Sequence, residues 1–117
     1  YTYPSFRLLE QIGVPQRQPL KTMFIIELTY KVELEKVDAH LEAHVEYLKK
    51  QYANQTFIAS GRKVPRTGGV ILSKVESKEA LLKVLDEDPF KVHGLADYRI
   101  VEFVPSMTSS DFENLKE

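Results

Sequence analysis

The sequence predicts an α+β protein of ferredoxin-like βαββαβ architecture, with a four-stranded antiparallel sheet that carries two helices on one face. From residue 23 on, strand-like and helix-like segments follow one another in that order, with glycine and proline between them. The 117-residue chain has room for one such domain. Because both helices cover the same side of the sheet, their side chains can meet.

Composition is typical of a folded domain, with 43% apolar and 28% charged residues. No apolar run approaches the roughly 20 residues of a membrane helix, and no signal-peptide pattern is present, so we expect a cytoplasmic protein without membrane contact. The lack of cysteine excludes disulfides and thiolate metal sites. A net charge of −1 provides no general attraction for nucleic acid.

Residues 1–22 differ from the rest of the chain, since they contain three prolines and no sustained apolar period. The segment FRLLEQIG could form a short helix between Ser5 and Gly13. The chain does not begin with Met, whereas Met23 opens a clear strand. We interpret residues 1–22 as an expression-derived leader or an appended arm.

Residues 23–32, MFIIELTYKV, are rich in β-forming residues and predict the first strand. A helix is predicted from residue 34 to about residue 52, because apolar residues recur there at spacings of three and four. These apolar residues are Leu34, Val37, Leu41, Val45, Leu48 and Tyr52. The second strand is predicted over residues 55–60, and the loop GRKVPRTGG follows it.

Residues 70–75 predict the third strand, and Ser77 is a typical N-cap for a second helix with Leu81, Leu82 and Leu85 on one face. The helix ends before Pro89, since the residue before a proline avoids helical angles. A short turn to Gly94 and a fourth strand over residues 98–104 complete the fold. The predicted organisation is a leader or arm (1–22), the domain (23–105) and a polar, irregular tail (106–117).

The sheet face away from the helices is predicted to be partly apolar. Two alternating sets, Phe24, Ile26 and Leu28 in one strand and Phe57 and Ala59 in another, cannot all lie under two helices. A contiguous apolar sheet face is rarely left exposed to water. We therefore expect a homodimer through the sheet faces, with a ligand or the N-terminal segment as alternative covers.

His44 and Asp88 are the predicted catalytic residues. His44 lies about 50° from the centre of the apolar helix face, so its imidazole needs a polar partner. A backbone carbonyl could be that partner, and Asp88 could merely shape the turn before Pro89. A carboxylate that accepts one imidazole N–H, however, fixes the tautomer and makes the other nitrogen a general base.

The loop over residues 61–69 carries three cations and no acid. Arginine binds carboxylate or phenolate oxygens in a bidentate manner, and Gly68 and Gly69 allow a ligand to approach the backbone. A solvated hairpin loop is the alternative, and neither a P-loop nor a dinucleotide motif is present. The residues predicted to bind a small-molecule substrate are Ser60, Gly61, Arg62 and Arg66.

A metal site is an alternative role for the histidines. His40 and His44 are spaced as i and i+4, which suits chelation, with Asp88, a glutamate or His93 as third ligand. The residue after His40 is Leu41, so the HExxH pattern is missing. We predict neither a metal nor a cofactor.

From Met23 to about Pro105 the sequence resembles the YciI-like (YCII-related) family of the dimeric α+β barrel superfamily. The matching segments are HVEYL at residues 44–48, ASGR at 59–62, Gly68-Gly69, Asp88-Pro89-Phe90 with Gly94-Leu95, and Val-Glu-Phe at 101–103. The resemblance implies a homodimer with facing sheets and a catalytic pair at His44 and Asp88. It also implies proton abstraction, as in elimination from chlorinated hydroquinone-like substrates.

Three other functions remain to be weighed. A small-molecule-binding or accessory module without catalysis fits the same fold, with the open sheet face as a ligand cleft or subunit interface. RNA-recognition modules share the βαββαβ order, but the third strand lacks the aromatic residues on which they stack bases. Haem-degrading monooxygenases of this superfamily often rely on tryptophan, and this chain has none.

Overall fold

The computed structural model describes residues 22–116 and has the predicted ferredoxin-like α+β architecture. Its sheet is antiparallel with strand order β2-β3-β1-β4. The elements are β1 (Met23–Tyr30), α1 (Leu34–Asp38), α2 (Leu41–Ala53), β2 (Phe57–Arg62), β3 (Gly68–Ser73), α3 (Lys78–Leu85), α4 (Pro89–Val92), β4 (Ala96–Phe103) and a 3₁₀-helix, η1 (Ser110–Leu115). No helix in the described part of the chain is long and apolar enough to cross a membrane.

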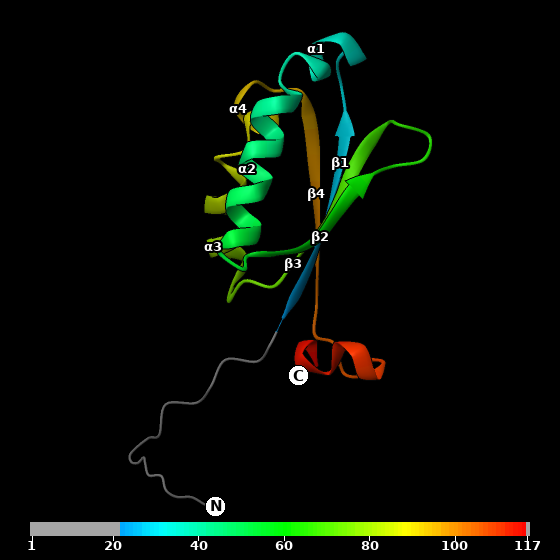
Figure 1. Cartoon of the computed structure of the whole chain (residues 1–117), viewed down its shortest axis with the longest axis vertical. Coiled ribbons are helices and arrows are strands. Elements are labelled where there is room, and N and C mark those ends of the chain that lie inside the picture. The colour runs from blue at the N-terminus through cyan, green and yellow to red at the C-terminus, as the bar shows by residue number, and fades with distance from the viewer. Residues whose placement is uncertain (1–21, 117) are drawn as a thin grey trace, which may run out of the picture.

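The hydrophobic core lies between the sheet and the helices, and α2, α3 and α4 lie on the same side of the sheet (Figure 1). Phe24, Ile26 and Leu28 of β1 point into this core and are almost completely buried. Leu81 and Leu85 of α3 pack against them from the helix layer. All three β1 residues therefore lie under the helices.

The pairing of β2 with β3 contains a β-bulge. Because of it, side chains of β2 do not alternate between the two sheet faces as predicted. Phe57 pairs with Ser73, whereas Ala59 pairs with the neighbouring Leu72. An extra residue in one strand reverses the alternation of faces beyond it. Phe57 is thus buried in the core and Ala59 is exposed, so the prediction that they share a face is wrong.

The same bulge decides which way the end of β2 faces. Ser60 pairs with Ile71, a core residue, and Arg62 pairs with Gly69, which pairs in turn with Leu28 of the core face. Side chains at paired positions share a face of the sheet. Ser60 and Arg62 therefore lie on the helix side, where strict alternation from Phe57 would have placed them on the other side.

The opposite face of the sheet is partly apolar. Ile25 pairs with Leu72 on one side and with Val101 on the other. Val101 and Phe103 are 41% and 39% exposed, and no helix in residues 22–116 lies over this face (Figure 1). The prediction of an uncovered sheet face is correct, although the apolar residues on it differ from those expected.

The first predicted helix, residues 34–52, is divided into α1 and α2. His40 departs from helical angles, with φ −113° and ψ 8°, so α2 begins in a new direction (Figure 1). Val37 of α1 is fully buried, but Leu41, four residues later in the predicted apolar stripe, is 39% exposed. The prediction of one continuous buried apolar stripe along residues 34–52 is therefore wrong.

The face that α2 buries also differs from the prediction. His44, Tyr47 and Gln51 are the buried residues of this helix. The apolar stripe of Leu41, Val45, Leu48 and Tyr52 is partly exposed instead. The physical reason is that α2 turns this stripe toward a cavity, so His44, predicted at the edge of the buried face, lies within it.

Three strands begin at residues other than those predicted. The second strand begins at Phe57 and not at Gln55, because Gln55 adopts a left-handed φ of 62° in the turn after α2. β3 and β4 begin two residues earlier than predicted, at Gly68 and Ala96, because β1 extends far enough to pair with both.

The second crossover largely follows the prediction. The Ser77 side chain accepts a hydrogen bond from the Ala80 N–H and caps α3, and Asp88-Pro89 begins the short α4. Leu82 is a correction, since it is 39% exposed while Leu81 and Leu85 are fully buried.

Both ends of the chain were predicted to lie outside the domain. The predicted irregular tail contains η1, whose local i→i+3 hydrogen bonds include Phe112 N–H to Ser109 C=O at 3.0 Å. The predicted leader or arm, with its short helix, lies outside the described residues except for Thr22.

Candidate active site

The side chains of His44 on α2 and Asp88 at the start of α4 lie in direct contact. His44 Nδ1 is 2.7 Å from Asp88 Oδ1. Asp88 is fully buried and His44 is 8% exposed. While Asp88 is ionised its oxygens only accept hydrogen bonds, so Nδ1 carries the shared hydrogen and Nε2 is left as an acceptor in the neutral imidazole.

The local sequence explains the direction of the Asp88 side chain. Asp88 is the N-cap of α4, and Oδ1 accepts a hydrogen bond of 3.0 Å from the Phe90 N–H. Pro89 occupies the first helical position, where its missing N–H is not needed. Oδ2 accepts a hydrogen bond of 2.6 Å from the Tyr98 hydroxyl of β4. The carboxylate is therefore held by three hydrogen bonds, from His44, Phe90 and Tyr98.

The imidazole of His44 is positioned by packing as well as by Asp88. It stacks on the Phe90 ring with a centroid distance of 3.8 Å and an interplanar angle of 4°. Nε2 has no hydrogen-bond partner among the described residues. His44 also lines a cavity, so this nitrogen is available to a molecule that binds there.

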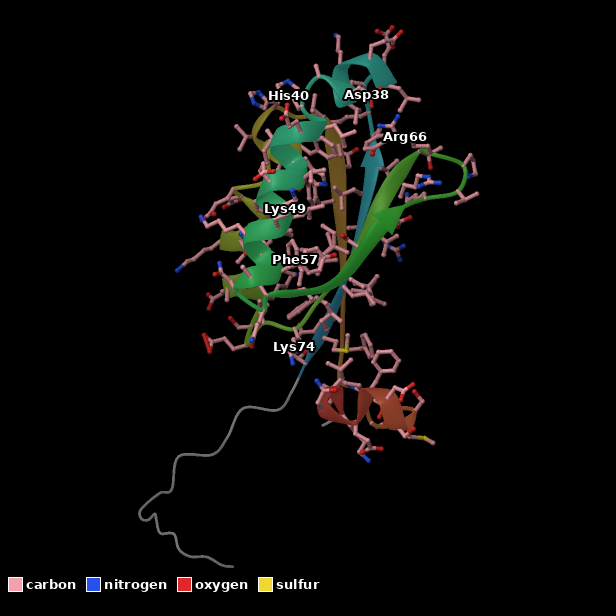
Figure 2. The ribbon with its side chains drawn as sticks, viewed as in Figure 1. Asp38, His40, Lys49, Phe57, Arg66 and Lys74 are labelled. Carbon is pink, nitrogen blue, oxygen red and sulfur yellow. The ribbon has the colours of Figure 1, made fainter. Side chains whose placement is uncertain are left out.

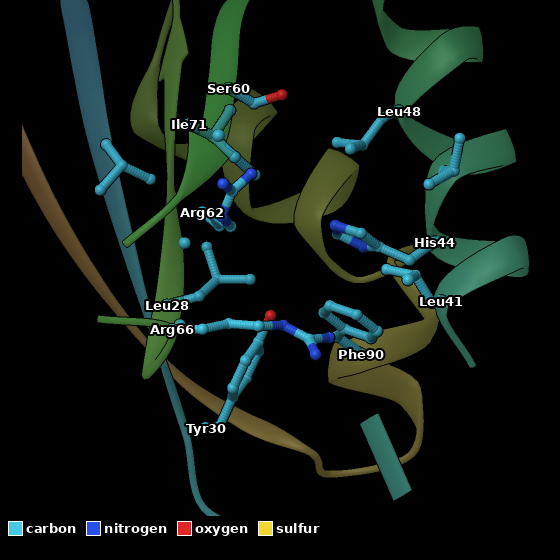
Figure 3. Close-up of a pocket in the computed structure, with 15 residues that line it drawn as sticks. Leu28, Tyr30, Leu41, His44, Leu48, Ser60, Arg62, Arg66, Ile71 and Phe90 are labelled. Atoms are coloured by element: carbon cyan, nitrogen blue, oxygen red, sulfur yellow. The ribbon is translucent and has the colours of Figure 1, made fainter. Parts of the chain in front are cut away.

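The cavity has a volume of about 370 Å³ and lies between α2 and the β2–β3 side of the sheet (Figure 3). This is the size of a small-molecule site, roughly 300–1,000 Å³. Its helix wall carries the apolar stripe of Leu41, Val45 and Leu48, and its sheet wall carries Leu28 and Ile71. Apolar walls with a few polar groups suit a small molecule that is mostly apolar.

Two arginines line this cavity, and in the part of the chain that the structure describes only one of them has a partner. Arg66 forms an ion pair with Asp38 and lies 5.9 Å from the Tyr30 ring centroid (Figure 2). The Arg66–Asp38 hydrogen bond is the largest cause of a raised Arg66 pKa. Arg62 has no hydrogen bond or ion pair with any residue in the range 22–116, so its guanidinium is available to an anionic ligand.

The third cation of the predicted basic loop lies on the other side of the sheet. Lys63 Nζ is 2.9 Å from Glu27 Oε2 and 3.0 Å from the Thr29 hydroxyl. This contact is the largest cause of a lowered Glu27 pKa. The loop is therefore no uniform cationic patch, because successive strand residues face opposite ways.

Ser60 and Gly61 also line the cavity. The Ser60 hydroxyl is 2.5 Å from the Tyr52 hydroxyl of α2 and so joins the two walls. Gly61 has open space where a Cβ would lie, whereas a Cβ on Gly68 would come within 1.8 Å of the Leu28 carbonyl oxygen. Close strand pairing therefore accounts for Gly68, which was predicted to let a ligand approach the backbone.

His40 belongs to a different contact from His44. Its ring stacks on His93 with a centroid distance of 4.0 Å. In the part of the chain that the structure describes, no three histidine, aspartate or glutamate side chains are grouped to hold a metal. The alternative of a His40–His44 chelate therefore has no support in this arrangement.

A model of the YCII-related domain matches residues 23–104, which is most of the chain. The chain belongs to the YCII-related family. No match is found among curated proteins.

This YCII-related domain is similar in structure to 5-chloro-2-hydroxyhydroquinone dehydrochlorinase (TftG) from Burkholderia phenoliruptrix AC1100, solved in complex with 2,5-dihydroxybenzoquinone. The TM-score is 0.63 and the sequence identity 19%, over 71% of this chain and 94% of that one. At this identity the likeness supports the fold assignment alone.

Sequence reasoning missed Phe90 and Tyr98 as parts of the site of this YCII-related domain. Phe90 was named only as part of the matching segment Asp88-Pro89-Phe90, yet it forms the surface on which His44 stacks. Tyr98 was expected only as the start of a strand, and its contact with Asp88 depends on how β4 pairs with β1. Burial and then the charge of Asp88 raise the pKa of Tyr98 well above its ordinary value.

Proposed function

We propose that this chain is a small-molecule enzyme in which His44 and Asp88 perform general acid/base proton transfer, in a lyase or elimination type of reaction on a small anionic or phenolic substrate. One observation carries the proposal: a buried imidazole lies 2.7 Å from a carboxylate, and its other nitrogen adjoins a cavity with an arginine that has no partner among residues 22–116. A base, a cavity and an anion-binding group are the parts that such a reaction needs.

The proposed proton transfer begins at Nε2 of His44, which accepts a proton from the substrate. In an elimination, the electrons of the broken C–H bond form the new double bond, and the leaving group departs with its own bonding pair. The imidazolium that results is stabilised by Asp88 through the Nδ1–H hydrogen bond. The proton then leaves Nε2 for solvent at the open side of the cavity.

Arg62 is proposed to bind the negative charge of the substrate. Its guanidinium enters the cavity from β2, across from His44 on α2 (Figure 3). A cation in this position stabilises a phenolate or carboxylate oxygen before the reaction and the charge that develops during proton removal. Ser60 and Gly61 are proposed to contact the substrate in the cavity, and Arg66 beside Tyr30.

The similar structure supports the reaction type. TftG is named a dehydrochlorinase and was solved with a dihydroxybenzoquinone, so this fold can accommodate an elimination on a phenolic ring. The second candidate function, a binding or accessory module, is supported by the same cavity but assigns no reaction to the His44–Asp88 pair.

A ligand and turnover screen tests the proposal. The full chain is incubated with hydroxyquinones, halogenated hydroquinones and aromatic carboxylates, and melting temperature and chloride release are measured. We expect at least one anionic or phenolic ligand to raise the melting temperature, and chloride to be released from a halogenated phenolic compound. Binding without turnover across the panel would favour the accessory module.

Arg62→Gln, with Lys63→Gln as its control, tests the anion-binding role in the same screen. Arg62 faces the cavity and has no partner among the described residues, whereas Lys63 is paired on the other sheet face. Loss of a charged hydrogen bond weakens binding by about tenfold or more. We expect this loss for Arg62→Gln alone, and equal effects of both changes would remove Arg62 from the site.

We also propose that a second copy of the chain covers the open sheet face. Val101 and Phe103 are exposed apolar residues on this face. Light scattering should give about twice the 13.5 kDa chain mass, and Val101→Glu should shift it toward the monomer. Val64→Glu, at a 90% exposed hairpin position, is the control. A monomeric mass for the unaltered chain would refute the dimer.

A further inference from the structure

We infer that Tyr98 is a positioning residue that holds the Asp88 carboxylate aimed at His44, so that Nε2 of His44 remains the proton-accepting nitrogen. This inference rests on the proposed function, because it assigns Tyr98 a part in preparing the proposed base. Tyr98 contacts neither the cavity beside His44 nor His44 itself, and acts through Asp88.

The hydrogen bonds of Asp88 show why the Tyr98 hydroxyl matters. Oδ1 accepts from two donors, His44 Nδ1–H and the Phe90 N–H. Oδ2 accepts from Tyr98, which is its one donor among the described residues. Since Asp88 is fully buried, water cannot readily replace that donor. Loss of the hydroxyl would leave a buried carboxylate oxygen without a partner.

The position of this donor also controls where protons can lie. A neutral Asp88 would carry a hydrogen on one oxygen and could donate it to Nδ1 of His44. The remaining hydrogen of a neutral imidazole would then be on Nε2, and the nitrogen at the cavity would no longer accept a proton. Tyr98, by donating to Oδ2, holds the carboxylate with Oδ1 as the acceptor for Nδ1–H, and thus favours the tautomer with Nε2 free.

Tyr98 is well suited to remain a donor. Burial raises the pKa of its hydroxyl, and the charge of Asp88 raises it further, so the hydroxyl keeps its hydrogen at neutral and mildly alkaline pH. Its ring lines a second cavity of about 330 Å³, where Lys91 Nζ lies 5.9 Å from the ring centroid. Removing the hydroxyl therefore changes the contact with Asp88 while the ring can stay in place.

The chain offers a matched control in Tyr47. Tyr47 is also a buried tyrosine whose pKa is raised, first by burial and then by Asp88. Its hydroxyl donates to the Val84 carbonyl at 2.8 Å and not to Asp88. Tyr98→Phe and Tyr47→Phe thus each remove one partly buried phenol hydrogen bond, and only the first removes a bond to Asp88.

The test measures the His44 tautomer by NMR of the full chain labelled with ¹⁵N-histidine, between pH 6 and 9. We expect the Nδ1–H tautomer in the unaltered protein and in Tyr47→Phe. In Tyr98→Phe the fraction with hydrogen on Nε2 should rise by about tenfold or more, the equilibrium change that one charged hydrogen bond produces. An unchanged tautomer in folded Tyr98→Phe would overturn the inference.

A second measurement covers the case in which Tyr98→Phe does not fold. The Tyr47→Phe chain is produced with 3-fluorotyrosine, whose hydroxyl is a stronger hydrogen-bond donor. Its His44 Nδ1 resonance is compared with that of the same ¹⁵N-histidine-labelled variant that contains ordinary tyrosine. A shifted resonance is expected, and an unmoved one would refute a role for Tyr98. These readouts need no turnover, so a chain that shows the tautomer effect but no reaction would contradict the proposed function alone.

Discussion

Replacing His44 by asparagine lowers kcat by about 10²–10⁴-fold on any substrate that the chain turns over, because this is the contribution of a positioned general base. The asparagine amide can occupy the place of Nδ1 and still donate to Asp88, so the burial of Asp88 is preserved. No atom then remains at the position of Nε2. The measurement is steady-state turnover with the compound found in the ligand screen.

His40→Ala is the control for this prediction. His40 lies four residues earlier and stacks on His93, outside the residues that line the cavity beside His44. We expect the kcat of His40→Ala to remain within about twofold of the kcat of the unaltered protein, because this change lies away from the reacting atoms. The catalytic role of His44 would be disproved by a His44→Asn chain that keeps more than half of its turnover.

Replacing Asp88 by alanine lowers the free energy of unfolding by about 3–5 kcal/mol, because it leaves buried hydrogen-bond donors without an acceptor at a cost of about 1–3 kcal/mol each. Three donors lose their acceptor: His44 Nδ1–H, the Phe90 N–H and the Tyr98 hydroxyl. The N-cap of α4 is lost as well. Domains of this size are stable by only about 5–15 kcal/mol, so urea unfolding should show a large shift of the midpoint.

Asp86→Ala provides a matched control two residues earlier. Asp86 is also paired, with Lys91 at 2.8 Å, but its side chain is 65% exposed. An exposed ion pair contributes about 0–1 kcal/mol, so the unfolding midpoint should hardly change. If Asp88→Ala were as stable as Asp86→Ala, the proposed tightly held carboxylate would not exist, and the base would lack its orienting group.

The extent to which the site could be predicted differs from residue to residue. His44 and Asp88 were expected to be near each other because the fold places both helices on one side of the sheet, and the structure brings them to 2.7 Å. Arg62 was expected in a basic loop, but its direction depends on the bulge after Phe57, which no sequence pattern marks. Tyr98 could not be linked to Asp88 without the register of β4 on β1.

The helix that carries His44 shows why some predictions were wrong. Apolar spacing predicted that Leu41, Val45 and Leu48 face the core, and these residues instead line the cavity. Spacing reveals which side chains avoid water, but a cavity wall and a core satisfy that requirement equally well. The break at His40, which turns His44 inward, arises from backbone angles that the apolar pattern does not encode.

Local sequence signals are sufficient to predict the order of strands and helices, the fold class and the residue types available for chemistry, because alternation, helical spacing, caps and prolines act over a few neighbouring residues. Which of those residues meet depends on how the strands and helices pack together. The β2 bulge, the turn at His40 and the pairing of β4 with β1 depend on contacts between segments far apart in the chain. For that reason the imidazole, its carboxylate and the Tyr98 hydroxyl could be joined into one arrangement only once the sheet and helices were assembled.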